Sequence, residues 1–361
     1  LYMYLKLMKI ADKNAQEFKL FLKYSEEIGL DNSMVQAAGG NTSIKIGDDM
    51  WVKASGKWLI NSISEEIMVP ISIARIKDVL QKDNCNDTDI VNCINRELSS
   101  NEFRPSVEAP MHAILDYKYV FHTHDLSVNA LTVQKNSQLM FEKALNGLNW
   151  KFIPYIKPGI ELCRQLVKLK SKDDNIFILE NHGLIICGQD LNEIKNLNNE
   201  IRRRLKILQN RNIMRPPTKH FEEIITLKDT GYQFCEDESI NALAFHQPSI
   251  DKLSQGMLLP DFLVFLGPSL KTINPADSDF LDKIKKLSQN PLPLNSCIIL
   301  AGKGIIMRAD ALKGTLEIMR YVYDLLSLIP DNADLKYLNE NETLALLNWE
   351  SEHYRQNQNK L

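Results

Sequence analysis

Two histidines stand one residue apart in the stretch VFHTHDLS, at His122 and His124, in a chain that has seven histidines in all. On a β-strand, residues i and i+2 point to the same face, so both imidazoles can aim at one point while Thr123 faces away. Neutral imidazole is a common zinc ligand. Two polar residues where a strand meets solvent would give the same pattern, so the pair alone leaves both interpretations open.

A third histidine and a glutamate lie on either side of this pair in the sequence. The stretch ENHGL places His182 in a turn between two apolar runs, and Gly183 allows tight backbone there. The stretch RPSVEAPMH places Glu108 four residues before His112, on one face of a predicted helix. Each has an ordinary alternative: a structural histidine at position 182 and a solvated helix charge at position 108.

Two further polar residues flank these candidates. His112 could orient Glu108 or serve the fold, and ligation is the weaker interpretation because three other histidines already satisfy a metal. Asp125 could hold a ligand imidazole in one tautomer, as carboxylates behind metal ligands do, or it could cap the helix that follows.

The elements that must position these residues can be read from apolar periodicity and turn residues. The sequence predicts, in order, a helix at 16–30, a hairpin of strands 43–46 and 50–54, a helix at 107–117, a strand at 118–124, two buried strands within 175–188 and a helix at 191–208. A polar, proline-bearing stretch at 209–220 then marks a domain boundary. We therefore expect one domain at 1–215 and a second at 221–361.

The second domain reads as a smaller α/β unit. Apolar runs occupy 258–267 and 296–309, and a helix is predicted at 310–329. The order strand–turn–strand–helix occurs at 176–208 and again at 297–329, which is the order that a degenerate duplication would leave.

Five stretches in a fixed order resemble the class II aldolase/adducin family: GGNTSIK, VKASGKWL, RPSVEAPMH, VFHTHDLSVNALT and ENHGLIICG. That family includes fuculose-1-phosphate and rhamnulose-1-phosphate aldolases and ribulose-phosphate 4-epimerase. The sequences of these stretches most resemble the aldolase portion of bifunctional rhamnulose-1-phosphate aldolase/alcohol dehydrogenases. No glycine-rich dinucleotide fingerprint follows a predicted strand, so we do not expect their dehydrogenase part here. The expected fold is α/β (α+β), with a central mixed sheet flanked by helices.

The resemblance also implies roles for individual residues. It implies a zinc site, or a site for another divalent metal, formed by His122, His124 and His182, with Glu108 as the acid/base. The implied phosphate-binding residues are Gly40, Asn41, Ser55, Gly56 and Ser106. Lys57 would add positive charge to them, although an exposed strand lysine is an equal interpretation. The family element before the glutamate usually has two small hydroxyl residues, whereas this chain has Ser106 followed by Val107.

The chemistry that such a site supports is aldol cleavage or formation of a C–C bond in a ketose phosphate or a related sugar. A divalent metal stabilises the enediolate as a Lewis acid, a nearby carboxylate moves the proton, and glycine-rich backbone with hydroxyl and amide side chains binds the phosphate. The same site would serve a sugar-phosphate 4-epimerase or a 3-oxo-acid phosphate decarboxylase. A non-catalytic, adducin-like interaction protein would lack the ligands. Family aldolases often use a tyrosine to protonate the aldehyde oxygen, and the candidates are Tyr155, Tyr337 and Tyr354.

Composition limits the partners. The chain has 361 residues, 44% hydrophobic and 25% charged, with a net charge of −3, which indicates a globular protein and disfavours nucleic-acid or anionic-membrane partners. Six cysteines without a C-x-x-C pair are typical of reduced thiols, so we expect a cytoplasmic protein. The apolar stretch LYMYLKLM is too short to span a membrane, and no signal-peptide cleavage site follows it. The resemblance implies a homo-oligomer, with a tetramer favoured, whose partner is a small-molecule substrate.

Overall fold

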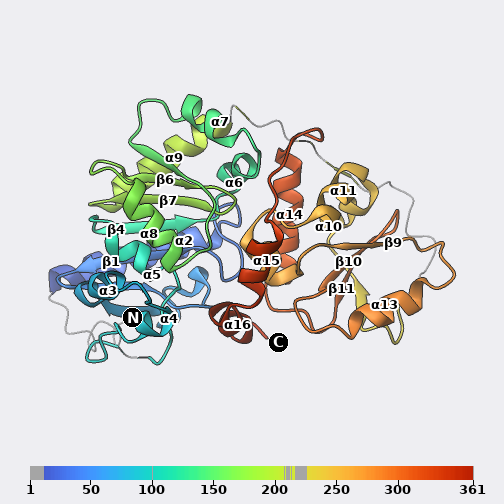
Figure 1. The fold of residues 1–361 in the computed structure, drawn as a ribbon, viewed down its shortest axis with the longest axis horizontal. Helices are drawn as coiled ribbons and strands as arrows, with labels where there is room; N and C mark the ends of the chain where they lie inside the picture. Colours follow the sequence, from blue (N-terminus) through green and yellow to red (C-terminus); the bar gives the residue numbers. More distant parts are fainter. Residues whose placement is uncertain are drawn as a thin grey trace. The chain divides into compact units, whose positions relative to one another are not determined.

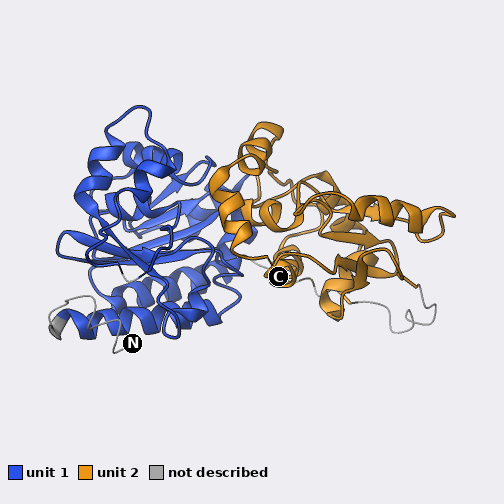
Figure 2. Ribbon diagram, turned by 90° about the horizontal axis from the view of Figure 1, so that it is seen from below, with its two compact units in different colours: residues 1–132, 136–207 blue, residues 133–135, 208–361 orange. Residues whose placement is uncertain are grey.

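A computed structural model of the chain describes residues 12–99, 101–206, 208, 212, 214–215 and 226–360. The chain divides into two compact units (Figure 2), with residues 1–132 and 136–207 in unit 1 and residues 133–135 and 208–361 in unit 2. The predicted domain boundary at 209–220 falls largely outside the described residues, as does the apolar stretch LYMYLKLM.

Unit 1 contains a seven-stranded sheet in the order β3-β2-β1-β4-β7-β6-β5 (Figure 1). All neighbouring pairs are antiparallel except β5 and β6, which are parallel, so the sheet is mixed as expected. Its strands are β1 (Asn41–Ile46), β2 (Asp49–Lys53), β3 (Met68–Ser72), β4 (Tyr119–Thr123), β5 (Trp150–Ile153), β6 (Ile176–Leu179) and β7 (Gly183–Gly188).

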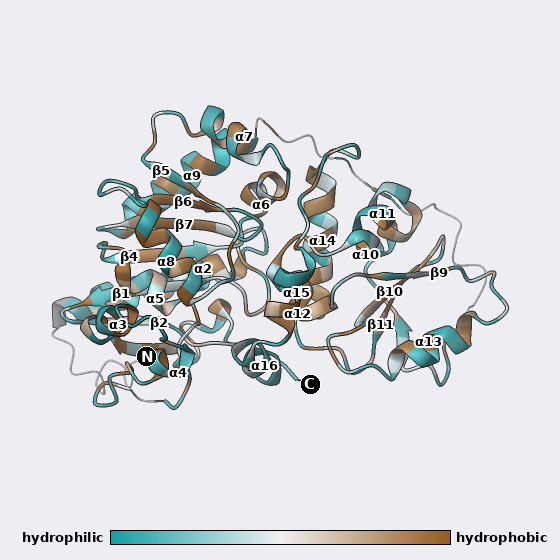
Figure 3. Ribbon diagram, viewed as in Figure 1, coloured by the Kyte–Doolittle hydropathy of each residue, from teal (hydrophilic) through white to brown (hydrophobic). Residues whose placement is uncertain are grey.

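Helices cover both faces of this sheet. They are α2 (Asp12–Leu30), α3 (Ile73–Leu80), α4 (Asp87–Val91), α5 (Ala109–Ile114), α6 (Leu126–Thr132), α7 (Ser137–Ala144), α8 (Ile160–Leu169) and α9 (Leu191–Lys206), with a short 3₁₀ turn at Leu59–Asn61. Alternate strand residues enter different cores: Phe121 packs in the core of α2 and α9, whereas Val120 packs in the core of α5 and α8. Strands buried on both faces are apolar throughout, as the brown β6 and β7 in Figure 3 show.

Most of the predicted elements of unit 1 are confirmed, and one helix is shorter than predicted. The helix expected at 107–117 is α5, Ala109–Ile114. Pro110 lies in its first turn, where a missing N–H costs little. The helix ends before Leu115, whose backbone is extended and leads the chain towards β4.

Unit 2 contains a four-stranded sheet in the order β8-β11-β10-β9. Its strands are β8 (Tyr232–Phe234), β9 (Lys271–Ile273), β10 (Cys297–Leu300) and β11 (Gly304–Arg308). Its helices are α10 (Glu238–Ala242), α11 (Gln247–Gln255), α12 (Pro260–Leu266), α13 (Phe280–Ser288), α14 (Thr315–Leu328), α15 (Glu340–Leu347) and α16 (Glu350–Asn357), with a 3₁₀ turn at Leu243–Phe245. The helix predicted at 310–329 begins at Thr315, because Gly314 before it has a left-handed φ of 102°.

Within the described ranges, no helix is both long enough and apolar enough to cross a membrane.

Candidate metal centre

Three histidines from two neighbouring strand ends converge in unit 1. His122 lies in β4, His124 follows β4 directly, and His182 lies in the turn between β6 and β7. Their ring centroids are 4.8 to 5.3 Å apart, and one potential ligand nitrogen of each lies within 4.8 Å of the others. All three are buried. The sequence separation of about sixty residues is closed by antiparallel pairing of β4 with β7, in which His122 lies opposite Ile185.

Gly183 makes this convergence sterically feasible. A Cβ on Gly183 would lie 2.4 Å from the carbonyl oxygen of Thr123 and 3.2 Å from Cε1 of His122. The turn before it is tight, since Asn181 has a φ of 51° and the N–H of His182 donates to the carbonyl of Leu179. The two histidine-bearing segments can therefore pack this closely only with glycine at position 183.

Glu108 contacts two of the histidines through its carboxylate. Its Oε2 lies 3.4 Å from Nε2 of His122, and its Oε1 lies 3.5 Å from Nε2 of His182. Nδ2 of Asn41 donates to Oε2 at 2.7 Å, and Asn41 is the residue opposite His122 in the β1–β4 pair. Burial alone would raise the pKa of Glu108, but the neighbouring imidazoles, with His122 foremost, lower that pKa to about 2.

Glu108 does not lie on a helix face, contrary to the expectation from the sequence. It occupies the position before α5, with a φ of −92° and a ψ of 3°, and only its carbonyl accepts a helical bond, from the N–H of His112. The Pro110 in the first turn of α5 moves the helix start past Glu108. The carboxylate is thereby directed into the centre instead of along the helix.

His112 is held apart from Glu108 by its own partner. Its Nδ1 is 2.8 Å from Oγ of Ser43, and the side chain is fully buried. Burial lowers the pKa of His112 to about 3, against the opposing charge of Glu108, so its imidazole is neutral at pH 7. It is not a member of the three-histidine cluster.

Asp125 caps a helix, which is one of the two roles expected for it. Its Oδ1 accepts from the N–H groups of Ser127 and Val128 at the start of α6, and its Oδ2 lies 3.5 Å from Nε of Arg202. Burial raises the pKa of Asp125 to about 6, although Arg202 and the two backbone N–H groups act in the opposite direction. A different residue, Asn129, secures the histidine turn by donating from Nδ2 to the carbonyl of His182 at 3.1 Å.

The residues implied in phosphate binding fall into two turns of unit 1. Gly40 and Asn41 open β1, and Gly40 has a φ of 55° with Val35 and the carbonyl of His122 against it. Oγ of Ser106 accepts from Nδ2 of Asn41 at 3.2 Å and from the N–H of Glu108 at 3.3 Å. This network brings Asn41, Ser106 and Glu108 together.

The second turn follows β2. Gly56 has a left-handed φ of 78°, and the N–H of Ser55 donates to the carbonyl of Arg104, which places this turn beside the Ser106 segment. The ammonium of Lys57 lies 3.3 Å from Glu65 and 4.3 Å from the ring centroid of Phe103.

Lys53 was not singled out from the sequence and connects these two turns. Its side chain is 2% exposed, and its Nζ donates at 2.7 Å to the carbonyl of Ala38 and at 2.7 Å to the carbonyl of Lys57. The sequence does hint at this role, since Lys53 ends an otherwise apolar run in β2. A lysine buried there needs several hydrogen-bond acceptors around its ammonium group. Lys53 therefore fixes the spacing of the Gly40 and Gly56 turns.

Residues 20–208 match the Class II Aldolase and Adducin N-terminal domain, which is more than half of the chain. The chain belongs to the class II aldolase and adducin family. Among curated relatives, L-fuculose phosphate aldolase of Methanocaldococcus jannaschii is 24% identical over 181 residues, which cover 48% of this chain and 84% of that protein. A Bacillus subtilis protein named "Uncharacterized oxidoreductase YuxG" is 27% identical over 177 residues, which cover 46% of this chain. The matched part is 25% of the length of that protein.

Among solved structures, the N-terminal class II aldolase domain of a conserved protein from Thermoplasma acidophilum shares 27% identity with this chain. It covers 52% of this chain and 91% of that structure, with a TM-score of 0.46. The residues that the family domain matches, 20–208, belong almost entirely to unit 1, which carries the three-histidine cluster.

The tyrosine candidates lie in different units. Tyr155 follows β5 in unit 1, and its N–H donates to Oε2 of Glu180. Tyr337 and Tyr354 belong to unit 2, and burial raises the pKa of Tyr337 to about 12.

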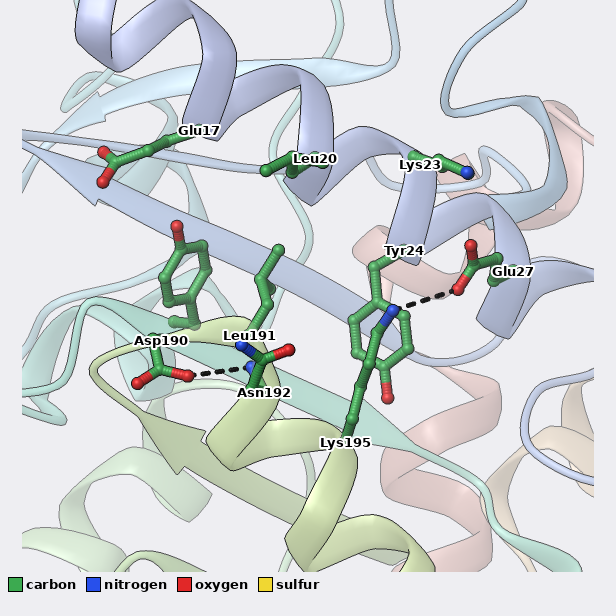
Figure 4. A pocket seen from close by; sticks show the side chains of 10 residues that line it. Glu17, Leu20, Lys23, Tyr24, Glu27, Asp190, Leu191, Asn192 and Lys195 are labelled. Carbon is green, nitrogen blue, oxygen red and sulfur yellow. Dashed lines mark hydrogen bonds and ion pairs between the residues drawn. The ribbon is translucent and has the colours of Figure 1, made fainter.

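Unit 1 also has a surface pocket of about 330 Å³ between α2 and the start of α9 (Figure 4). Lys195 lies across it, 4.4 Å from the ring centroid of Tyr24 and 3.4 Å from Oε2 of Glu27. None of its ten lining residues is a member of the histidine cluster or of the two turns.

A pH measurement tests the neutral state of His112. Its folded-state pKa of about 3 is below the unfolded value of about 6.5, so its stabilising contribution is complete above pH 6.5 and is lost as the pH falls towards 3. Between pH 7 and pH 5 this loss is about 2 kcal/mol of unfolding free energy. We expect His112→Asn, in which the amide can still bond Ser43, to lose less than the native protein over this range in urea titrations with chelator present. An equal loss in both proteins would show that His112 titrates normally.

A substitution tests the role of Lys53. Lys53→Met keeps the side-chain volume but leaves the carbonyls of Ala38 and Lys57 without their donor, so we expect a loss of about 2–4 kcal/mol of unfolding free energy. The matched control is Lys57→Met, which removes a partly exposed ion pair and should cost less than about 1 kcal/mol. Equal stability of the two variants would contradict the role assigned to Lys53.

Proposed function

We propose that the chain is a zinc-dependent class II aldolase-type lyase that cleaves or forms a C–C bond in a ketose phosphate or a related sugar. The observation that carries the proposal is the convergence of His122, His124 and His182 on one point with the Glu108 carboxylate against two of them. The match of this region to the family supports it, as does the similarity to a protein named L-fuculose phosphate aldolase.

The three histidines fit a divalent metal by number, type and environment. Three imidazoles with an open fourth position are a donor set that Zn²⁺ uses in catalytic sites. Nδ1 of His122 lies 3.1 Å from the carbonyl of Leu184, which directs its Nε2 towards the centre. When bound, a metal ion there supplies Lewis-acid stabilisation of the negative charge that develops as the C–C bond breaks.

Glu108 is the group that we assign to proton transfer. Asn41 donates to its Oε2, whereas its Oε1 lies 3.5 Å from Nε2 of His182, at the centre of the cluster. Oε1 is therefore the oxygen that takes up and returns the substrate proton. The carboxylate is ionised at neutral pH, which is the protonation state that a base requires.

Substrate orientation is the task that we assign to the two turns. Left-handed glycines at positions 40 and 56 shape the two turns, and glycine-rich turns of this kind are common anion sites. The hydroxyls of Ser55 and Ser106 add hydrogen-bond donors, Lys57 adds charge, and the amide of Asn41 positions Ser106 and Glu108. These groups would hold the phosphate of a sugar phosphate while its carbonyl end reaches the histidine cluster.

The cellular setting forms part of the same proposal. The six cysteines are free thiols, and five of them are buried, which suits a cytoplasmic enzyme. We propose a homo-oligomer, a tetramer by resemblance to the family, acting on a small-molecule substrate.

Glu108→Gln tests the assignment of the proton-transfer group. The amide keeps the size of the side chain and the bond to Asn41 but cannot accept a proton, so we expect kcat to fall roughly a hundredfold or more. Zinc content, measured on the same sample by elemental analysis, should remain at one per chain. A Glu108→Gln protein with unchanged turnover and full metal content would contradict the mechanism.

Removal of a ligand tests the metal site. We expect chelation to abolish activity and Zn²⁺ to restore it, and we expect His182→Ala to weaken Zn²⁺ binding more than roughly a hundredfold. His353→Ala, an exposed histidine in unit 2, is the control and should bind zinc normally. Incubation with candidate ketose phosphates and NMR of the products separates aldol cleavage from epimerisation and decarboxylation. A native protein without affinity for zinc would instead favour an adducin-like interaction protein.

A further inference from the structure

We propose that unit 2 is a degenerate second copy of the half of unit 1 that runs from β4 to α9, and that its metal-ligand positions have been replaced. The two sheets have the same order and the same strand directions: β4-β7-β6-β5 in unit 1 and β8-β11-β10-β9 in unit 2. In each, the first pair is antiparallel, the second is an antiparallel hairpin, and the third is parallel. One helix connects the parallel strands, α8 or α13, and one follows the hairpin, α9 or α14.

The hairpin turns agree in detail. The N–H of His182 donates to the carbonyl of Leu179 at 3.2 Å, and the N–H of Lys303 donates to the carbonyl of Leu300 at 2.9 Å. Both turns have three residues, and the middle one has a left-handed φ, 51° and 67° respectively. A glycine follows each turn, Gly183 in unit 1 and Gly304 in unit 2.

Each hairpin is also tied to the neighbouring parallel strand in the same way. The N–H of Glu180 donates to Ile153, the last residue of β5, and the N–H of Ala301 donates to Ile273, the last residue of β9. Both distances are 3.0 Å. Two separate hydrogen bonds, one within and one outside the hairpin, therefore place the turns in equivalent positions.

A sequence motif accompanies this geometry. The segment after β4 reads DLSVNAL and the segment after β8 reads DESINAL, starting at Asp125 and Asp237. Each aspartate accepts from the N–H groups two and three residues later and so caps the helix that follows. Each also faces an arginine of the helix after the hairpin, Arg202 at 3.5 Å and Arg320 at 2.7 Å.

The asparagine of the motif has a matching position too. Asn129 donates to the carbonyl of His182 in the first hairpin turn, and Asn241 accepts from the N–H of Ile305, the second residue after the other turn. Five identical positions in seven, in the same place on the same topology, exceed what a shared α/β fold requires.

The strand register then identifies the equivalents of the three metal-ligand positions. His122 lies opposite Ile185, the second residue after Gly183, and Phe234 lies opposite Ile306, the second residue after Gly304. Phe234 is therefore the equivalent of His122, and Glu236 is the equivalent of His124. Lys303 is the equivalent of His182, because each is the last residue of its turn. Phenylalanine and lysine cannot replace imidazole ligands, so we infer that the described part of unit 2 has lost the histidine site.

The experiment restores histidines at the equivalent positions in the full chain. The double variant Glu236→His with Lys303→His is made together with alanine at His122, His124 and His182, so that zinc binding reports unit 2. Two imidazoles on one ion bind bivalently, so we expect Zn²⁺ affinity by titration calorimetry to be roughly a hundredfold higher than in the control. The control is Gln233→His with Lys303→His, because Gln233 lies on the opposite face of β8 from Phe234.

A second variant samples the other pair of positions. Phe234→His with Glu236→His reproduces the spacing of His122 and His124, and it should also bind Zn²⁺ more tightly than the control. Circular dichroism of each protein verifies folding. If both folded variants bind zinc no better than the control, unit 2 is not a copy of the metal-binding half. Because the readout is zinc affinity in unit 2, this result leaves the proposed function of unit 1 untouched.

Discussion

The pairing of β4 with its two neighbours is the constraint on which the rest of the site depends. On one side, β1 places Asn41 opposite His122, and on the other side β7 places Ile185 opposite the same histidine. Three strands that are distant in sequence therefore define one line across the sheet. Glu108 is held at one end of that line by Asn41, and His182 is held at the other by the turn before β7. A register shift by one residue in either pair would turn His122 to the opposite face.

Burying the polar groups of the site in unit 1 has a considerable desolvation cost. Nearby hydrogen bonds and charges offset that cost for each group. The Glu108 charge is surrounded by imidazoles, and Lys53 donates to two carbonyls of the flanking turns. Asp125 accepts two backbone bonds and faces Arg202. Polar networks of this kind fix one arrangement, because each member left without its partner would cost more than a comparable surface group.

Sequence reasoning identified the residues with distinctive chemistry and missed those that act through the backbone. The H-x-H spacing and the N-H-G turn predicted the cluster because strand periodicity is a strong constraint. The helix position of Glu108 was wrong, since the helix begins at Ala109 and not at residue 107, and periodicity alone does not fix a helix boundary. Lys53 was missed because its function depends on two carbonyls, and carbonyls carry no residue identity. The repeated strand–turn–strand–helix order was visible in the sequence, but its full extent required the strand register of both sheets.

Asn41 connects the turn that precedes β1 to the carboxylate of Glu108, the group proposed to transfer the proton. Its backbone follows Gly40 and its side chain holds both Oε2 of Glu108 and Oγ of Ser106. In the proposed reaction, a phosphate bound at these turns would fix the position of Asn41 and therefore the position of Glu108. Binding energy from a remote part of the substrate would then be used at the reacting carbon, so that an unphosphorylated ketose loses turnover as well as affinity.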